Sequence, residues 1–106
     1  MKRYILDKDA RTPVLIEDRS VWLAWWKDNS KAYIRKTVCC ESVVVSTLFS
    51  GLADENDTTP QLFETIVLGG FFDCTTTFYT NYDEAVKGHR DMLRLVDEAL
   101  AAARSK

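Results

Sequence analysis

The stretch that decides the fold covers residues 43–72 and reads VVVSTLFSGLADENDTTPQLFETIVLGGFF. Two apolar runs rich in β-branched residues, 43–50 and 61–68, flank an acidic connection that begins at Gly51 and ends at Pro60. β-Branched side chains favour extended backbone, whereas Gly, Asp, Asn and Pro favour turns. The stretch therefore predicts a β-hairpin at the middle of a small antiparallel sheet.

The residues before the hairpin predict a short ribbon, a helix and a strand. Turn-forming residues at 7–12 separate two short apolar runs, which is typical of a β-ribbon. Asp18 or Ser20 can cap a helix over residues 21–29. Residues 31–40 then alternate as in a half-buried strand, with Ala32, Ile34, Lys36 and Val38 on one side and Tyr33, Arg35, Thr37 and Cys39 on the other.

After the hairpin we expect one more strand and a closing helix. Residues 74–79 are threonine-rich and suit an edge strand, and Thr80 with Asp83 forms a capping box for a helix over residues 81–102. Helical spacing gives this helix an apolar face made of Ala85, Val86, His89, Leu93, Val96 and Leu100.

These elements predict an α+β fold in a single domain, residues 1–106, with the order ββ-α-ββββ-α. The expected architecture is an antiparallel sheet of about four strands plus an N-terminal β-ribbon, with two helices packed against the sheet.

Composition excludes several classes of protein. The apolar fraction of 46% and charged fraction of 28% are ordinary for a globular domain, and no apolar run approaches the roughly 20 residues of a membrane span. The N-terminus becomes charged too early for a secretory signal, so we expect a cytosolic location. Cys39, Cys40 and Cys74 follow no zinc spacing, and we expect reduced thiols, no metal and no cofactor.

Charge is distributed unevenly along the chain. Residues 1–36 carry a net +4, residues 37–86 carry −8 with no Lys or Arg, and residues 87–106 carry +2. Because a sheet without basic side chains is a poor surface for a phosphate backbone, duplex nucleic acid is an unfavoured partner. Any anionic ligand has to bind through the two ends of the chain.

Two titratable residues and one aromatic cluster have alternative interpretations. Glu64 shares a strand face with Leu62, Ile66 and Leu68, and such a carboxylate occurs in functional sites as well as in structural pairs. His89 on the apolar face suits a core residue better than a catalytic one, although an acid–base pair of Glu64 and His89 is the enzymatic alternative. Trp22, Trp25 and Trp26 share one helix face, which favours core packing over a ligand-stacking platform.

The connection at residues 51–60 and the closing helix hold the remaining candidates. Asp54, Glu55 and Asp57 resemble a calcium loop in composition but lack its spacing, so a solvated loop is favoured. Arg90 and Arg94 lie one helical turn apart and can clamp a phosphate. The favoured alternative is a solvated face on which Arg94 pairs with Asp97 or Glu98.

Three motifs with the paired tryptophans resemble a widespread family of small proteins encoded by phages and prophages. The motifs are VSTLFSGL-D, P-x-LFET-x-V-x-GG and YT-x-x-x-EA-x-x-GH, and the resemblance extends from Trp22 to His89. Family members carry a histidine after the aspartate that corresponds to Asp54. Here Ala53 intervenes and no histidine follows, so a role tied to that histidine does not carry over.

The resemblance implies a viral accessory protein. In size and layout the chain is also similar to the anti-Thoeris sponges. This similarity implies a counter-defence protein that sequesters a nucleotide immune signal without catalysis. The signal would be of the cyclic ADP-ribose or cyclic oligonucleotide type. Arg90 and Arg94 would bind a pyrophosphate, Phe63 or a tryptophan would stack a base, and an acidic side chain such as Asp73 would bind ribose hydroxyls. With Arg35 these are the expected ligand-binding residues, and Trp22, Glu64 and His89 are secondary candidates.

Such a site is large for 106 residues, so we expect it to form between subunits of a homo-oligomer. Trp22, Trp25, Trp26, Phe71 and Phe72 are the aromatic residues expected to be exposed. The alternative function is a protein-binding inhibitor of a host nuclease or CRISPR effector. It would act through the acidic region 41–84 as a mimic of nucleic acid, with a host defence protein as its partner.

Overall fold

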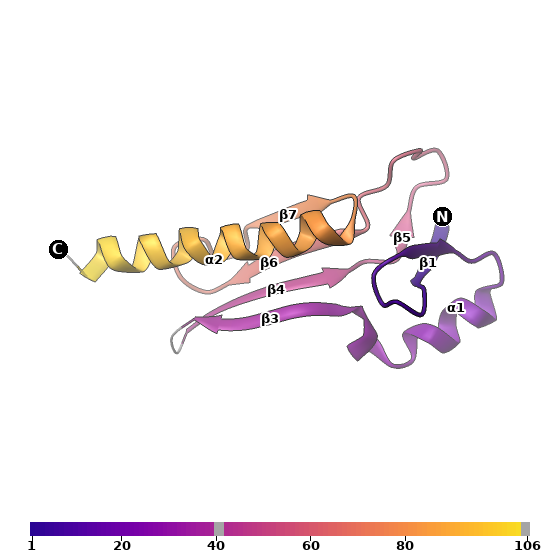
Figure 1. Ribbon diagram of the computed structural model, residues 1–106, viewed down its shortest axis with the longest axis horizontal. Coiled ribbons are helices and arrows are strands. Elements are labelled where there is room, and N and C mark those ends of the chain that lie inside the picture. The colour runs from indigo at the N-terminus through magenta and orange to yellow at the C-terminus, as the bar shows by residue number, and fades with distance from the viewer. Residues whose placement is uncertain (40–41, 105–106) are drawn as a thin grey trace.

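The protein has the predicted α+β architecture (Figure 1). The structure is a computed structural model that describes residues 1–39 and 42–104, so Cys40 and Glu41 lie outside the described residues. In chain order the elements are β1 (Lys2–Leu6), β2 (Pro13–Leu15), α1 (Arg19–Trp26), the 3-10 helix η1 (Asn29–Ala32), β3 (Tyr33–Cys39), β4 (Val43–Phe49), β5 (Leu52–Ala53), β6 (Phe63–Leu68), β7 (Thr76–Tyr79) and α2 (Tyr82–Arg104).

The predicted hairpin is confirmed as the centre of the larger sheet. β4 and β6 pair antiparallel, with Thr47 opposite Thr65, and the sheet order is β3-β4-β6-β7. β7 is an edge strand, as predicted. β3 pairs with β4 at the opposite edge.

α2 lies across one face of this sheet and contacts all four strands (Figure 1). Its buried residues are Ala85, His89, Met92 and Val96, whereas Leu93 and Leu100 of the predicted face are only half-buried at its margin. The cap also differs from the prediction. The Asn81 side chain accepts from the Glu84 N–H at 2.8 Å, and the Glu84 carboxylate accepts from the Asn81 amide at 3.1 Å. Asn81 and Glu84 have the capping-box spacing with a true Glu, and they displace the predicted pair of Thr80 and Asp83.

The N-terminal ribbon and α1 pack at the end of the larger sheet. β1 pairs with β2 as predicted and also with β5, a two-residue strand that the sequence pattern does not reveal. The indole N–H groups of Trp22 and Trp26 both point at the Tyr4 carbonyl oxygen, at 3.1 and 3.4 Å. Trp26 also stacks on Phe49, with ring centroids 5.9 Å apart and an interplanar angle of 10°. The tryptophans therefore serve core packing, and their rings are half-buried.

Gly51 makes the contact between these two parts possible. A Cβ atom at this position would lie 2.3 Å from a carbon of the Trp26 ring, and the backbone φ is +74°. Both conditions suit only glycine.

A β-bulge changes the two faces of β3. Tyr33 pairs with Leu48 and Arg35 with Thr47, so Ile34 is the extra residue between two registered pairs. Tyr33 therefore shares a face with Lys36 and Val38, and the predicted grouping of Tyr33 with Arg35 is wrong.

The sheet face opposite α2 has no helix on it among the described residues. Its exposed apolar residues are Tyr33 (53%), Val38 (62%), Leu68 (49%) and Phe78 (51%), and its half-buried apolar residues are Val44, Leu48 and Ile66. We call this surface, which also carries Lys36, Ser46, Glu64 and Thr76, the open face. No described helix is long and apolar enough to cross a membrane.

Candidate functional site

A chain of buried polar side chains lies at the centre of the interface between α2 and the sheet. His89 Nδ1 is 2.7 Å from Thr47 Oγ1, which is 2.6 Å from Thr65 Oγ1, and His89 Nε2 is 2.9 Å from Thr37 Oγ1. Thr47 and Thr65 are completely buried and His89 is 1% exposed. The chain separates two apolar clusters, one around Phe49 and Phe63 and one around Val45, Val67 and Val96.

The hydrogen bonds of this chain suit a neutral imidazole. Burial, followed by the positive charge of Arg35, lowers the pKa of His89 below its ordinary value. A neutral ring has one donor and one acceptor nitrogen, and hydroxyl groups can rotate to satisfy both in either tautomer. His89 is thus a hydrogen-bonded core residue, as favoured from the sequence. The signal that could have revealed its partners is the pair of threonines at matching inward positions of two paired strands.

Glu64 does not meet His89. Glu64 lies opposite Leu48 and Phe78 in the sheet and belongs to the open face, whereas neighbouring Thr65 points into the α2 side. The sheet therefore separates the carboxylate from the imidazole. The acid–base pair of Glu64 and His89 is wrong.

Arg35 of β3 and Arg90 of α2 both border the flank between these two elements. Arg35 is close enough for its charge to lower the pKa of His89, and Arg90 is the next residue after His89 on the helix. Gly88, on the other side of His89, faces the Tyr79 ring of β7. Since successive helical residues are about 100° apart, Arg90 projects towards the β3 flank. Both arginines are exposed, and neither forms a salt bridge to any residue that the structure describes.

Arg94 differs from Arg90 in its surroundings. Its Nη2 lies 3.5 Å from an Asp91 oxygen, and Asp91 also pairs with Lys87 at 3.6 Å. The local pair predicted for Arg94 therefore exists, but its partner is Asp91 and not Asp97 or Glu98. This carboxylate neutralises part of the charge that the predicted phosphate clamp requires.

The other predicted ligand-binding residues lie elsewhere. The Phe63 ring is completely buried between Phe49 and Tyr82, at centroid distances of 5.4 and 6.4 Å, so it is not available to stack a base. The Asp73 carboxylate accepts from the Gly69 N–H at 2.7 Å and closes the connection between β6 and β7. This connection lies on the side of the sheet formed by β6 and β7, opposite the edge strand β3. Of the predicted ligand-binding residues, Arg35 and Arg90 therefore share one flank, whereas Phe63 and Asp73 lie elsewhere. Trp22 is packed on β1.

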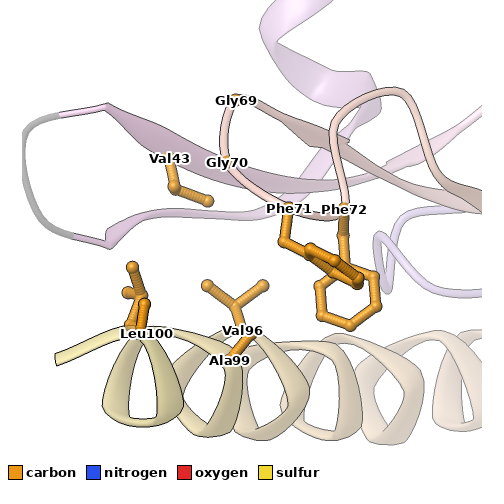
Figure 2. Close-up of a pocket in the computed structure, with 9 residues that line it drawn as sticks. Val43, Gly69, Gly70, Phe71, Phe72, Val96, Ala99 and Leu100 are labelled. Carbon is orange, nitrogen blue, oxygen red and sulfur yellow. The ribbon is translucent and has the colours of Figure 1, made fainter. Parts of the chain in front are cut away.

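An apolar groove lies between the second half of α2 and the residues that follow β6 (Figure 2). It has a volume of about 120 Å³, and its lining includes Val43, Phe71, Phe72, Val96 and Leu100. Phe71 is 87% exposed, so this expectation of an exposed aromatic is confirmed for Phe71, while Phe72 is half-buried. The groove contains none of the predicted ligand-binding residues.

The described residues contain no cluster of three or more His, Cys, Asp or Glu that could hold a metal ion. Asp54, Glu55 and Asp57 are all exposed in their loop. Comparison with protein-family models, with curated proteins and with solved structures found no match to this chain.

Proposed function

We propose that this chain is a non-catalytic binding protein of the phage counter-defence type that sequesters an anionic nucleotide signal at the flank of Arg35 and Arg90. The observation that carries the proposal is that two exposed arginines, one on β3 and one on α2, border the same flank without a salt bridge to an acidic residue among the described residues. Guanidinium groups bind phosphate oxygens through paired N–H donors. The resemblance to small phage proteins supports the viral role and a location in the host cytoplasm.

The surroundings of the two arginines favour phosphate over base recognition. Residues 37–86 supply no other cation, and Arg94 is already paired with Asp91. Because Phe63 is buried in the core, it offers no ring on which a base could stack. We therefore expect the ligand to be held by its phosphates, with weak discrimination between bases.

Calorimetric titration with cyclic ADP-ribose and with a cyclic dinucleotide tests this proposal. A hydrogen bond to a charged group contributes about 1.5–3 kcal/mol, so Arg35→Gln and Arg90→Gln should each weaken binding by about tenfold or more. Arg94→Gln is the matched control, because it removes the same charge from a residue that is already paired, and it should leave affinity nearly unchanged. Absence of binding by the wild-type protein, or an equal loss for all three variants, would contradict the proposal.

The alternative function, inhibition of a host defence protein, is favoured by one observation. Asp54, Glu55 and Asp57 are all exposed on one loop, although Glu55 lies 3.0 Å from the amino terminus. The open face is not acidic, since Glu64 is the carboxylate among its apolar side chains. If this function is correct, neutralising the three loop carboxylates will abolish inhibition of a purified host nuclease, while Arg35→Gln has no effect.

A further inference from the structure

The open face leaves the protein with more exposed surface than its size requires. The accessible surface is 6962 Å², whereas a folded monomer of 12.1 kDa exposes about 6,000 Å². The radius of gyration is 15.6 Å, compared with about 13 Å for a compact domain of this length. The excess of roughly 900 Å² is close to the 800 Å² that each partner buries in a standard interface. In Figure 1 α2 forms one layer on the larger sheet, and the N-terminal ribbon and α1 lie beyond one end of that sheet, so the molecule is elongated.

The open face carries two opposite charges, Lys36 and Glu64, among apolar residues and the uncharged Ser46 and Thr76. Sheet pairing places Lys36, Ser46, Ile66 and Thr76 in one row across the four strands, and Leu48, Glu64 and Phe78 in the next. Strand spacing of about 4.8 Å and a rise of about 3.3 Å per residue put Lys36 and Glu64 roughly 12 Å apart. They form no salt bridge within the chain. A charge buried without a partner is costly, so any occupant of this face has to supply one charge of each sign.

A second copy of the same chain supplies both charges. The same spacings place Lys36 and Glu64 each about 7 Å from the centre of the face, which lies between Ser46 and Ile66. Consider a two-fold axis that lies in the plane of the face, passes through this centre and bisects the angle between the directions to Lys36 and to Glu64. This axis brings each lysine opposite the other copy's glutamate. Because of the two-fold symmetry, the pair of Lys36 with Glu64 forms twice in each dimer. The two sheets then cross at a steep angle, as in orthogonal sheet packing.

We propose that this protein is a homodimer in which the open faces of two copies pack together, with Lys36 of each copy paired with Glu64 of the partner subunit. Tyr33, Val38, Leu68 and Phe78 become buried, and the sheets form the inner two layers of a four-layer assembly. α2 and the flank of Arg35 and Arg90 remain outside the interface. The dimer therefore does not depend on the proposed ligand binding.

Mass measurement by light scattering after gel filtration tests the dimer. The wild-type protein should have a mass of about 24 kDa, twice the 12.1 kDa of one chain, at concentrations near 100 µM. Leu68→Lys places a charge within the apolar contact and should give a folded monomer, with folding checked by circular dichroism. Phe71→Ser is the control, because Phe71 is 87% exposed and lies outside the open face. It should remain dimeric.

A charge exchange tests the two-fold pairing. Lys36→Glu and Glu64→Lys should each weaken the dimer by about tenfold or more, because each places like charges together twice. The double variant should recover an affinity close to that of the wild-type protein. A monomeric wild-type protein, or a dimer that Phe71→Ser disrupts and Leu68→Lys does not, would overturn the open-face dimer. Failure of the double variant to recover would overturn the pairing of Lys36 with Glu64.

Discussion

Replacing Thr47 with valine removes one hydroxyl from the buried polar chain and keeps the shape of the side chain. Thr47 Oγ1 contacts His89 Nδ1 at 2.7 Å and Thr65 Oγ1 at 2.6 Å, and all three residues are buried. Leaving a buried polar group without a partner costs about 1–3 kcal/mol. His89 Nδ1 and Thr65 Oγ1 both lose a partner in this variant, but the Thr65 hydroxyl can rotate, which reduces its share of the cost. We therefore expect the free energy of unfolding to fall by about 2–4 kcal/mol.

Urea unfolding followed by tryptophan fluorescence measures this loss, since Trp25 and Trp26 pack against Phe49 in the folded protein. With a slope of about 1.5 kcal/mol per molar urea, the midpoint should fall by roughly 1.5–2.5 M. Thr77→Val is the matched control because Thr77 is exposed on the edge strand, and it should change stability by less than about 0.5 kcal/mol. Variants are compared at one protein concentration, because dimerisation adds to apparent stability.

A double-mutant cycle distinguishes the polar chain from ordinary packing. Thr65→Val added to Thr47→Val should cost less than the sum of the two single changes, because each removes a partner of the other. Equal effects of Thr47→Val and Thr77→Val would refute the stabilising role of the chain. Strict additivity in the cycle would refute the coupling.

Three further outcomes follow from the contacts of α2. Burial lowers the pKa of His89 below 6.5, whereas the histidine of the unfolded chain titrates near 6.5. The free energy of unfolding should therefore fall on acidification below about pH 6.5, by at most about 1.4 kcal/mol per pH unit. Urea titrations of His89→Gln should show a flatter pH dependence. Gly88→Ala places a Cβ atom 2.1 Å from the Tyr79 hydroxyl oxygen. Thermal unfolding should therefore show a loss of about 1–3 kcal/mol in the free energy of unfolding, although alanine favours helices. An unchanged melting temperature would contradict this contact. Asn81→Ala should lower the free energy of unfolding by about 1 kcal/mol in the same assay, and Thr80→Ala clearly by less, because Asn81 caps the helix. A larger loss for Thr80→Ala would favour the cap predicted from the sequence.

Local patterns in the sequence predict most of the elements and which of them are neighbours. The hairpin, the N-terminal ribbon and the closing helix are confirmed because each depends on residues close together in the chain. β5 was missed because two residues carry no detectable alternation. The bulge at Ile34 was missed for a related reason, since one extra residue in β3 reverses the faces that strict alternation assigns.

The candidate site was harder to predict because it depends on which sheet face is covered. Alternation correctly separated Phe63 from Glu64, but it could not show that α2 covers the face of Phe63 and leaves that of Glu64 open. Phe63 was therefore assigned to a ligand although it belongs to the core. Arg35 and Arg90 lie far apart in the chain, and no spacing rule reveals that both border the flank between β3 and α2.

The close contacts at Gly51 and Gly88 affect how likeness to other proteins should be interpreted. Gly51 leaves room for the Trp26 ring, and Gly88 leaves room for Tyr79. Together with Thr47 and His89, they stand in the motifs on which the proposed resemblance to phage proteins rests, and all four form internal contacts. A relative that keeps these letters inherits the scaffold and remains free to vary its outer surface. Shared activity is therefore better judged by comparing the flank of Arg35 and Arg90 and the charges of the open face.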